Sequence, residues 1–242
     1  MIARAGEGDG APAGLLNSGI VFHPAWRVAS GAVLLWIQTW PLVAGTVTGK
    51  VTVLDKGGRL SQDAGDTVVW VEGAKGPLKP NRVVVTMKGK EFRPRVVVVP
   101  VGGTVEFPND DPILHNAFSV SGENRFDLDL YRRPKTGART FHHPGIVRVY
   151  CNIHPQMSAV VVVRDNPYFA QASGDGSFAI DEVPAGRYRL KAWHPRSGEV
   201  VKDLRVPAEG SLGVELTLDA SAFKRVPHKN KYGKAYGEGD RY

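Results

Sequence analysis

Four residues whose side chains bind soft metals lie in two short stretches of the chain. Cys151, His154 and Met157 have the spacing C-x2-H-x2-M, and His115 lies 36 positions before the cysteine. Cys151 is the only cysteine among 242 residues, which excludes an internal disulfide and a multi-cysteine zinc or iron–sulfur site. Two imidazoles, a thiolate and a thioether form the donor set of a trigonal copper site with a weak axial methionine. The spacing therefore predicts one copper ion held by these four residues.

Other interpretations of the same residues are weaker. Zinc accepts a cysteine and two histidines, but a thioether is a poor fourth ligand for zinc. A single cysteine or methionine is most often a core residue, yet the combination and the spacing favour a metal. The neighbouring histidines His142 and His143 precede a Pro-Gly turn. We interpret that pair as a solvent-facing turn rather than a second metal site.

The segments that must position these ligands are typical of short strands and turns. The 28 glycines and 17 prolines disfavour long helices. One strand is expected immediately before Cys151 and another shortly after Met157, so these ligands lie in a loop between strands. His115 follows a turn rich in proline and aspartate. The strands expected in this region are residues 83–87, 96–99, 104–107, 146–150 and 159–163.

Residues from about 91 to 165 resemble the cupredoxins, the small blue copper proteins, and are most similar to amicyanin and plastocyanin-like members. The resemblance rests on Gly102-Gly103-Thr104-Val105-Glu106-Phe107, on His115-Asn116, and on Tyr150-Cys151-Asn152-Ile153-His154-Pro155-Gln156-Met157. It implies a Greek-key β-sandwich with a type 1 copper site at one end. His115, Cys151 and His154 would be the strong ligands and Met157 the long axial one. Asn116 would tie the two ligand loops together. Members of this family include methylamine utilisation proteins, but no residue of this chain indicates a role in methylamine oxidation.

The flanks of this region resemble a second β-sandwich, of the carboxypeptidase regulatory-like, prealbumin type. Residues 46–72 match the first half of that pattern, and G-D-G-x-F with V-P-A-G-x-Y at 174–188 matches the second. The predicted fold is therefore all-β. A cupredoxin sandwich at 82–165 would divide a small prealbumin-like sandwich into residues 46–81 and 166–220. The alternative is a tandem in which residues 46–80 add strands to the copper domain.

The two ends of the chain read differently from the middle. Residues 1–44 form an N-terminal extension in which Arg27, a short apolar run and a small residue at Ala44 resemble a secretory signal. The run is shorter than the roughly 20 apolar residues of a membrane span. We expect export to the periplasm or beyond, with no stable span after signal removal. The alternatives are a retained N-terminal membrane anchor and a buried helix.

The charge of the chain is +7, and a large part of it lies in the last 22 residues. Residues 221–242 are predicted to be a basic flexible tail, and the scattered charge does not favour nucleic-acid binding. The basic residues of this tail are Lys224, Arg225, Lys229, Lys231, Lys234 and Arg241.

Together these features predict an exported one-electron carrier that is not an enzyme. An oxidase or reductase would need an open coordination position or a second copper cluster, and neither is visible in the sequence. The alternative function is copper binding or delivery, with the second sandwich as a docking module. The segment 125–133 departs from the cupredoxin pattern and is expected to be an exposed loop beside the copper end. Its arginines, Arg132 and Arg133 among them, favour an acidic redox protein that docks at the His154 end.

Overall fold

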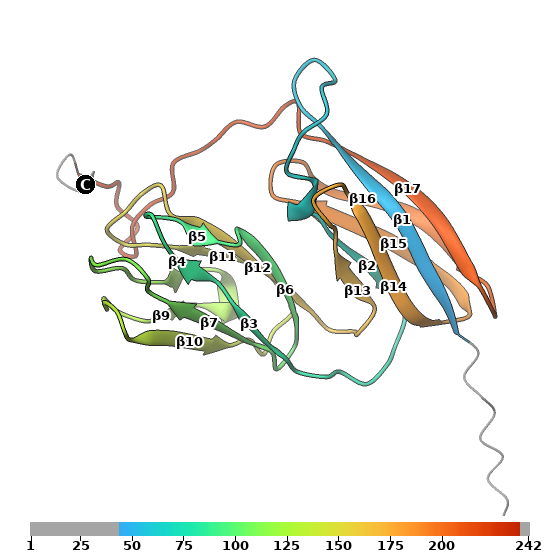
Figure 1. Ribbon diagram of the computed structural model, residues 1–242, viewed down its shortest axis with the longest axis horizontal. Coiled ribbons are helices and arrows are strands. Elements are labelled where there is room, and N and C mark those ends of the chain that lie inside the picture. Colours follow the sequence, from blue (N-terminus) through green and yellow to red (C-terminus); the bar gives the residue numbers. More distant parts are fainter. Residues whose placement is uncertain (1–43, 238–242) are drawn as a thin grey trace, which may run out of the picture. The chain divides into compact units, whose positions relative to one another are not determined.

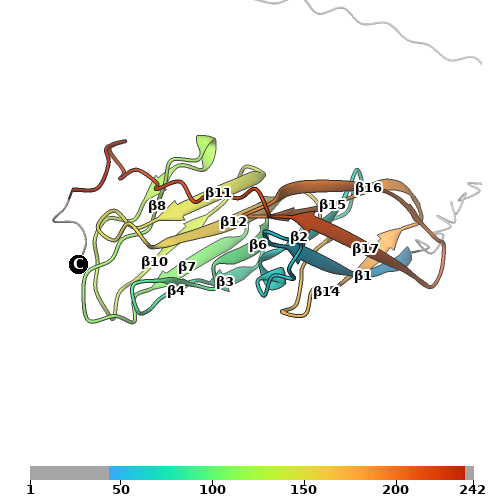
Figure 2. The ribbon, with the colours of Figure 1, turned by 90° about the horizontal axis from the view of Figure 1, so that it is seen from above.

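The computed structural model describes residues 44–237, which belong to one compact unit of the chain. The predicted signal segment lies outside the described residues except for Ala44, which begins the first strand. Within residues 44–237, none of the helices has the length and apolar character that would be needed to cross a membrane. Regular structure in this range consists of strands β1–β17 and two short 3-10 helices, so the all-β prediction is confirmed (Figures 1 and 2).

The central sandwich contains β3–β12 and its apolar core. Its two main sheets have the strand orders β6-β12-β11-β8-β9 and β10-β7-β3. Side chains alternate along these strands, so that Val105 and Phe107 of β7 share one core with Val147 and Val149 of β11. The elements are β3 (Arg82–Val84), β4 (Thr86–Met87), β5 (Phe92–Arg93), β6 (Val96–Pro100), β7 (Thr104–Pro108), β8 (Phe118–Ser119), η2 (Gly122–Asn124), β9 (Phe126–Asp127), β10 (Thr136–Thr140), β11 (Gly145–Tyr150) and β12 (Ser158–Arg164).

The flanking sandwich is built from strands on both sides of the central one. Its sheets have the orders β14-β1-β17 and β13-β2-β15-β16, and a second core lies between them. In the described residues, β1 and β2 pair only with strands of this sandwich, in contrast to the tandem alternative. The elements are β1 (Ala44–Leu54), η1 (Ala64–Asp66), β2 (Val68–Glu72), β13 (Phe169–Gln171), β14 (Ser177–Pro184), β15 (Gly186–His194), β16 (Gly198–Val206) and β17 (Ser211–Asp219).

One glycine of the G-D-G-x-F motif has a clear structural reason. Gly176 has φ +85° in the turn before β14, and its carbonyl accepts a hydrogen bond from the Val51 N–H. A Cβ at this position would lie 2.1 Å from the carbonyl oxygen of Val51. The turn therefore requires glycine both for its conformation and for the approach of β1.

The valine run of β12 is buried on both of its faces. Val161 and Val163 belong to the central core, whereas Val160 and Val162 join a third cluster with Trp70 of the flanking sandwich. A strand that is covered on both sides reads as a continuous apolar run instead of an alternating one. This explains why residues 160–163 are all valine.

The chain after β17 corrects one prediction. Residues 221–242 were expected to form a flexible tail, but residues 228–236 make hydrogen bonds and ring contacts with residues 150–152 of the central sandwich. Both ribbon views show this last described segment running from β17 to the far end of the central sandwich (Figures 1 and 2). A turn at residues 230–234, which the basic composition of the segment did not indicate, gives the segment a defined conformation. The Asn230 side chain accepts N–H bonds from Tyr232 and Lys234, and Gly233 has φ +76°.

Candidate metal centre

His115 lies in the loop between β7 and β8, where its backbone is paired. Its N–H and C=O exchange hydrogen bonds with Tyr131, at 3.0 and 2.8 Å. The Asn109 side chain donates to the carbonyls of Ile113 and Tyr131, which fixes the loop further. The segment 125–133 was expected to be exposed, and its charged side chains are, but Phe126 and Tyr131 are buried in the central core. The segment is therefore part of the frame that holds His115.

The other predicted ligands lie in the short connection between the antiparallel neighbours β11 and β12. The Met157 N–H donates to the His154 carbonyl at 3.0 Å, and the Cys151 N–H donates to the Met157 carbonyl at 3.4 Å. These bonds close residues 151–157 into a compact loop. Because β11 and β12 are anchored in the core, the loop holds its position relative to His115.

Three of the predicted ligands converge on one point. The Nδ1 atoms of His115 and His154 are 3.0 Å apart, and Cys151 Sγ is 3.6 Å from His154 Nδ1. The three donor atoms all lie within 4.8 Å of one another. His115 and Cys151 are fully buried and His154 is 4% exposed. Met157 is also buried and belongs to the same loop, and ligation by its thioether stays a prediction.

A carboxylate that the sequence interpretation missed orients His115. Asp111 Oδ2 lies 2.8 Å from His115 Nε2, and the N–H groups of Gly89 and Lys90 donate to the same carboxylate. Burial raises the pKa of Asp111, but these N–H donors and the imidazole outweigh it and lower that pKa to about 2. An ionised carboxylate only accepts hydrogen bonds, so the His115 proton lies on Nε2. The Nδ1 lone pair of His115 is then directed at His154 and Cys151.

Burial sets the protonation of the other two donors. It lowers the pKa of His154 to about 4, with repulsion from His115 and Lys90 acting in the same direction. The imidazole is therefore neutral at pH 7 and can offer a lone pair. Burial also raises the pKa of the Cys151 thiol, against backbone N–H groups of Asn116, Ile153 and His154 that favour the thiolate. A bound metal would remove the thiol proton, which couples metal binding to pH.

Asn116 connects the two ligand loops. Its Oδ1 accepts a hydrogen bond from the N–H of Asn152 at 2.8 Å, and its Nδ2 donates to Asp127 at 2.7 Å. The residue before Asn116 is His115, and the residue before Asn152 is Cys151. The contact therefore lies where the resemblance implied it.

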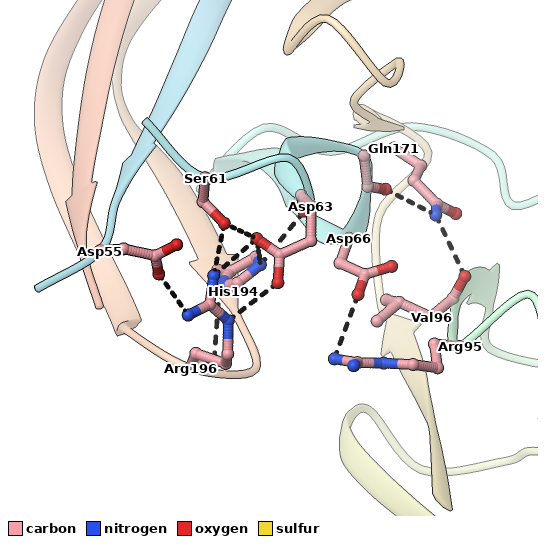
Figure 3. A network of polar contacts seen from close by, with 10 residues as sticks. Asp55, Ser61, Asp63, Asp66, Arg95, Val96, Gln171, His194 and Arg196 are labelled. Carbon is pink, nitrogen blue, oxygen red and sulfur yellow. Dashed lines mark hydrogen bonds and ion pairs between the residues drawn. The ribbon is translucent and has the colours of Figure 1, made fainter. Parts of the chain in front are cut away.

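A second cluster of possible metal ligands lies in the flanking sandwich (Figure 3). It contains Asp63, Asp66 and His194, and the sequence interpretation did not find it. Arg196 donates from Nε and Nη2 to the two carboxylate oxygens of Asp63, at 2.8 and 2.7 Å. His142 and His143 join neither cluster, and His143 is paired with Glu123 at an exposed position.

The first cluster fits copper and the second does not. Nitrogen and sulfur donors lie about 2.0–2.3 Å from a first-row metal, so two donors on one ion are about 3–4 Å apart. The separations of 3.0 and 3.6 Å have this size. The donor set also combines imidazole, which suits both copper states, with a soft sulfur. In the second cluster the Arg196 guanidinium is paired with the Asp63 carboxylate, which a metal ion would need as a ligand.

Comparisons with known proteins give cupredoxins among solved structures. A copper-containing nitrite reductase of Thermus scotoductus SA-01 is 34% identical over 38% of this chain and 24% of its own, with a TM-score of 0.34. This chain thus spans about a quarter of that enzyme. A purple cupredoxin of Nitrosopumilus maritimus is 23% identical over 35% of this chain and 99% of its own, with a TM-score of 0.30. A reduced amicyanin mutant is 22% identical over 40% of this chain and 98% of its own, with a TM-score of 0.33. No family model and no curated protein matches the sequence.

Proposed function

We propose that this chain is an exported type 1 copper protein that carries single electrons and is not itself an enzyme. The convergence of two imidazole nitrogens and one cysteine sulfur in a buried space carries this proposal. His115, His154 and Cys151 would hold one copper ion, with Met157 as a weak axial ligand. Bound copper would supply a one-electron couple, and the chain would supply a ligand frame that stays fixed.

The contacts around the ligands support a fixed frame. Asp111 orients His115, Asn116 joins the loops, and β11 and β12 hold Cys151 from both sides. A site that changes little between oxidation states exchanges electrons readily, because little reorganisation is needed. The burial of all three donors also favours a carrier over copper delivery, since delivery requires that a partner's ligands reach the ion.

The proposed partner is an acidic redox protein that docks at the His154 end. Support comes from basic side chains near the paired segment Tyr131–His115, because Arg132, Arg133 and Lys135 are exposed there. Such charges attract an acidic partner over about 10 Å at ordinary salt. Electron transfer to the partner should slow as salt rises, and Arg132→Glu with Arg133→Glu should slow it further at low salt. A rate that is independent of ionic strength contradicts this docking mode.

The flanking sandwich has a separate proposed role. We infer that it is a carboxypeptidase regulatory-like module that supports the central sandwich or docks a partner of the cell envelope. The buried cluster that contains Trp70, Trp193 and Val162 supports a structural role, because removal of the flank would expose it.

Titration of the metal-free protein with Cu(II) tests the function. We expect an intense thiolate-to-copper absorption band and the electron-spin spectrum of a His2Cys site, at one copper per chain. Cys151→Ser should lose the band, because a hydroxyl is too hard a ligand to replace the thiolate. His154→Gln should weaken binding, whereas its matched control His142→Gln should retain the parent spectrum. A Cu(II) protein without the band overturns the proposal.

A further inference from the structure

The C-terminal segment 228–236 contacts the ligand loop directly. The Tyr236 hydroxyl donates to the carbonyl of Cys151 at 2.8 Å. The Lys231 N–H donates to Asn152 Oδ1 at 2.9 Å. Both partners lie in the short loop that carries the predicted cysteine and histidine ligands. The segment is thus bonded to the backbone of one ligand and to the side chain of its neighbour.

One residue of this segment closes a ring of polar contacts. Lys231 Nζ pairs with Asp127 Oδ2 at 2.6 Å, and Asp127 Oδ1 accepts from Asn116. Asn116 in turn accepts the N–H of Asn152, whose side chain accepts the N–H of Lys231. The ring therefore passes through Asn116, Asn152, Lys231 and Asp127. Two of these four residues directly follow the predicted ligands His115 and Cys151.

Ring contacts anchor the segment at its two ends. The His228 imidazole stacks on Tyr150, with ring centroids 4.0 Å apart and an angle of 21° between the planes. The Tyr236 hydroxyl lies 3.2 Å from His228 Nδ1, so the two ends of the segment also contact each other. The turn at Asn230 and Gly233 lies between them and points Lys231 at Asn152. The segment therefore has a defined conformation that its own internal contacts stabilise.

We propose that residues 228–236 form a clamp on the copper-ligand loop, in which Lys231 and Tyr236 are positioning residues. The inference rests on the proposed copper function and adds to it a part of the chain outside the cupredoxin pattern. The side chain of Asn116 joins the backbones of the two loops by one hydrogen bond. The clamp adds a second path through Asp127 and Lys231 and holds the Cys151 carbonyl from outside. Its loss should loosen the position of the cysteine sulfur relative to the two imidazoles.

A matched pair of double variants tests the clamp in the full chain. Lys231→Met with Tyr236→Phe removes the Asp127 pair and the bond to the Cys151 carbonyl. Lys234→Met with Tyr232→Phe makes the same changes in composition at exposed positions of the same segment. Three quantities should be measured: the thiolate-to-copper spectrum, the reduction potential, and the rate of copper loss to a chelator. Hydrogen exchange of residues 151–157 in the metal-free protein provides a readout that needs no copper.

In the clamp variant we expect copper loss to be about tenfold faster, as found when groups around metal ligands are removed. The potential should shift and the amides of residues 151–157 should exchange faster, while the control variant equals the parent. A parent with the normal spectrum and a clamp variant with unchanged copper loss, potential and exchange overturn the clamp. A parent without the thiolate-to-copper band overturns the copper function instead, so the two failures are distinguishable.

Discussion

Two of the buried histidines in residues 44–237, His115 and His194, each lie beside a carboxylate, and they differ in which ring nitrogens could bind a metal. His115 gives Nε2 to Asp111, and its Nδ1 lies 3.0 Å from Nδ1 of His154, which is itself a predicted ligand. His194 donates through Nε2 to the Asp63 carbonyl and accepts at Nδ1 from the Arg196 N–H. Both ring nitrogens of His194 are therefore engaged in hydrogen bonds. Nearness of ligand types does not make a metal site unless the donor atoms face one another, as in the first cluster, instead of backbone groups, as at His194.

The charge around the two clusters differs in the same sense. In the flanking cluster Arg196 pairs with Asp63 and with Asp55, and Ser61 donates to Asp63 as well (Figure 3). These contacts supply the positive charge that the carboxylates need. Between His115, His154 and Cys151 no such cation is bonded to the donor atoms in the part of the chain that the structure describes. The first cluster thus has the character of a binding site and the second that of a structural network.

The same substitution in each cluster should give opposite results, and this is the largest effect that we expect. Asp111→Asn removes the group that fixes the His115 proton on Nε2, so copper affinity should fall about 10–100-fold. Asp63→Asn should leave copper affinity unchanged and lower only the stability of the fold. Competition with a chelator of known affinity measures the first, and thermal unfolding of the metal-free protein measures the second. Equal copper affinity in both variants would remove the distinction between the clusters.

The sequence predicted three of the donors that the structure brings together, but only part of their surroundings. Cys151, His154 and His115 were found because their types are rare and because the strand–loop–strand context fixes their approach. Asp111 was missed, since an aspartate in a Pro-Asn-Asp-Asp-Pro turn looks like any turn residue. The ordered segment around Lys231 was missed because its contacts reach across 79 positions to Asn152. Pairings of this range depend on tertiary structure and leave no periodic pattern in the sequence.

The fold shows the same limit. Alternating strands such as residues 104–107 were predictable from their period of two. The segment 125–133 is exposed at its charged residues, as expected, but its alternation of charged and apolar residues is also that of a strand with one face buried. Phe126 lies in β9 and contributes that buried face. The alternation was present, but the sheet against which it packs was not visible from the sequence.

Removal of the guanidinium should convert the structural network into something closer to a metal site. Arg196→Met leaves Asp63 and Asp55 without their cation, and we expect a loss of about 2 kcal/mol in unfolding free energy. The variant should then be stabilised by added Zn²⁺, because the carboxylates of Asp63 and Asp66 lie within reach of one ion and Asp63 has lost its cation. Arg95→Met is the control, since it removes an exposed partner of Asp66 and leaves Asp63 paired. Thermal unfolding with and without Zn²⁺ decides, and a variant indifferent to Zn²⁺ means that the bonds to His194 block the site.

The smallest effect concerns acid stability, and it depends on the paired state of Asp63. Burial raises the pKa of Asp63, but hydrogen bonds from Arg196 and Ser61 outweigh it and lower that pKa to about 2. A carboxylate with a lowered folded-state pKa contributes stability that is complete above its ordinary value of 3.8 and is lost as the pH falls toward 2. The side chain is 28% exposed, so the contribution is reduced by solvent to about 1 kcal/mol.

Between pH 4 and 2, the unfolding free energy of the parent should fall by this amount more than that of Asp63→Asn. Burial lowers the pKa of His194 and the Asp63 carboxylate raises it, so protonation of His194 destabilises the fold as the pH falls below 6.5, and it does so more in Asp63→Asn than in the parent. Urea unfolding of the metal-free proteins at pH 4, 3 and 2 measures the difference. Parallel curves for parent and variant would mean that Arg196 stabilises the flanking sandwich by packing and not by its pairing with Asp63.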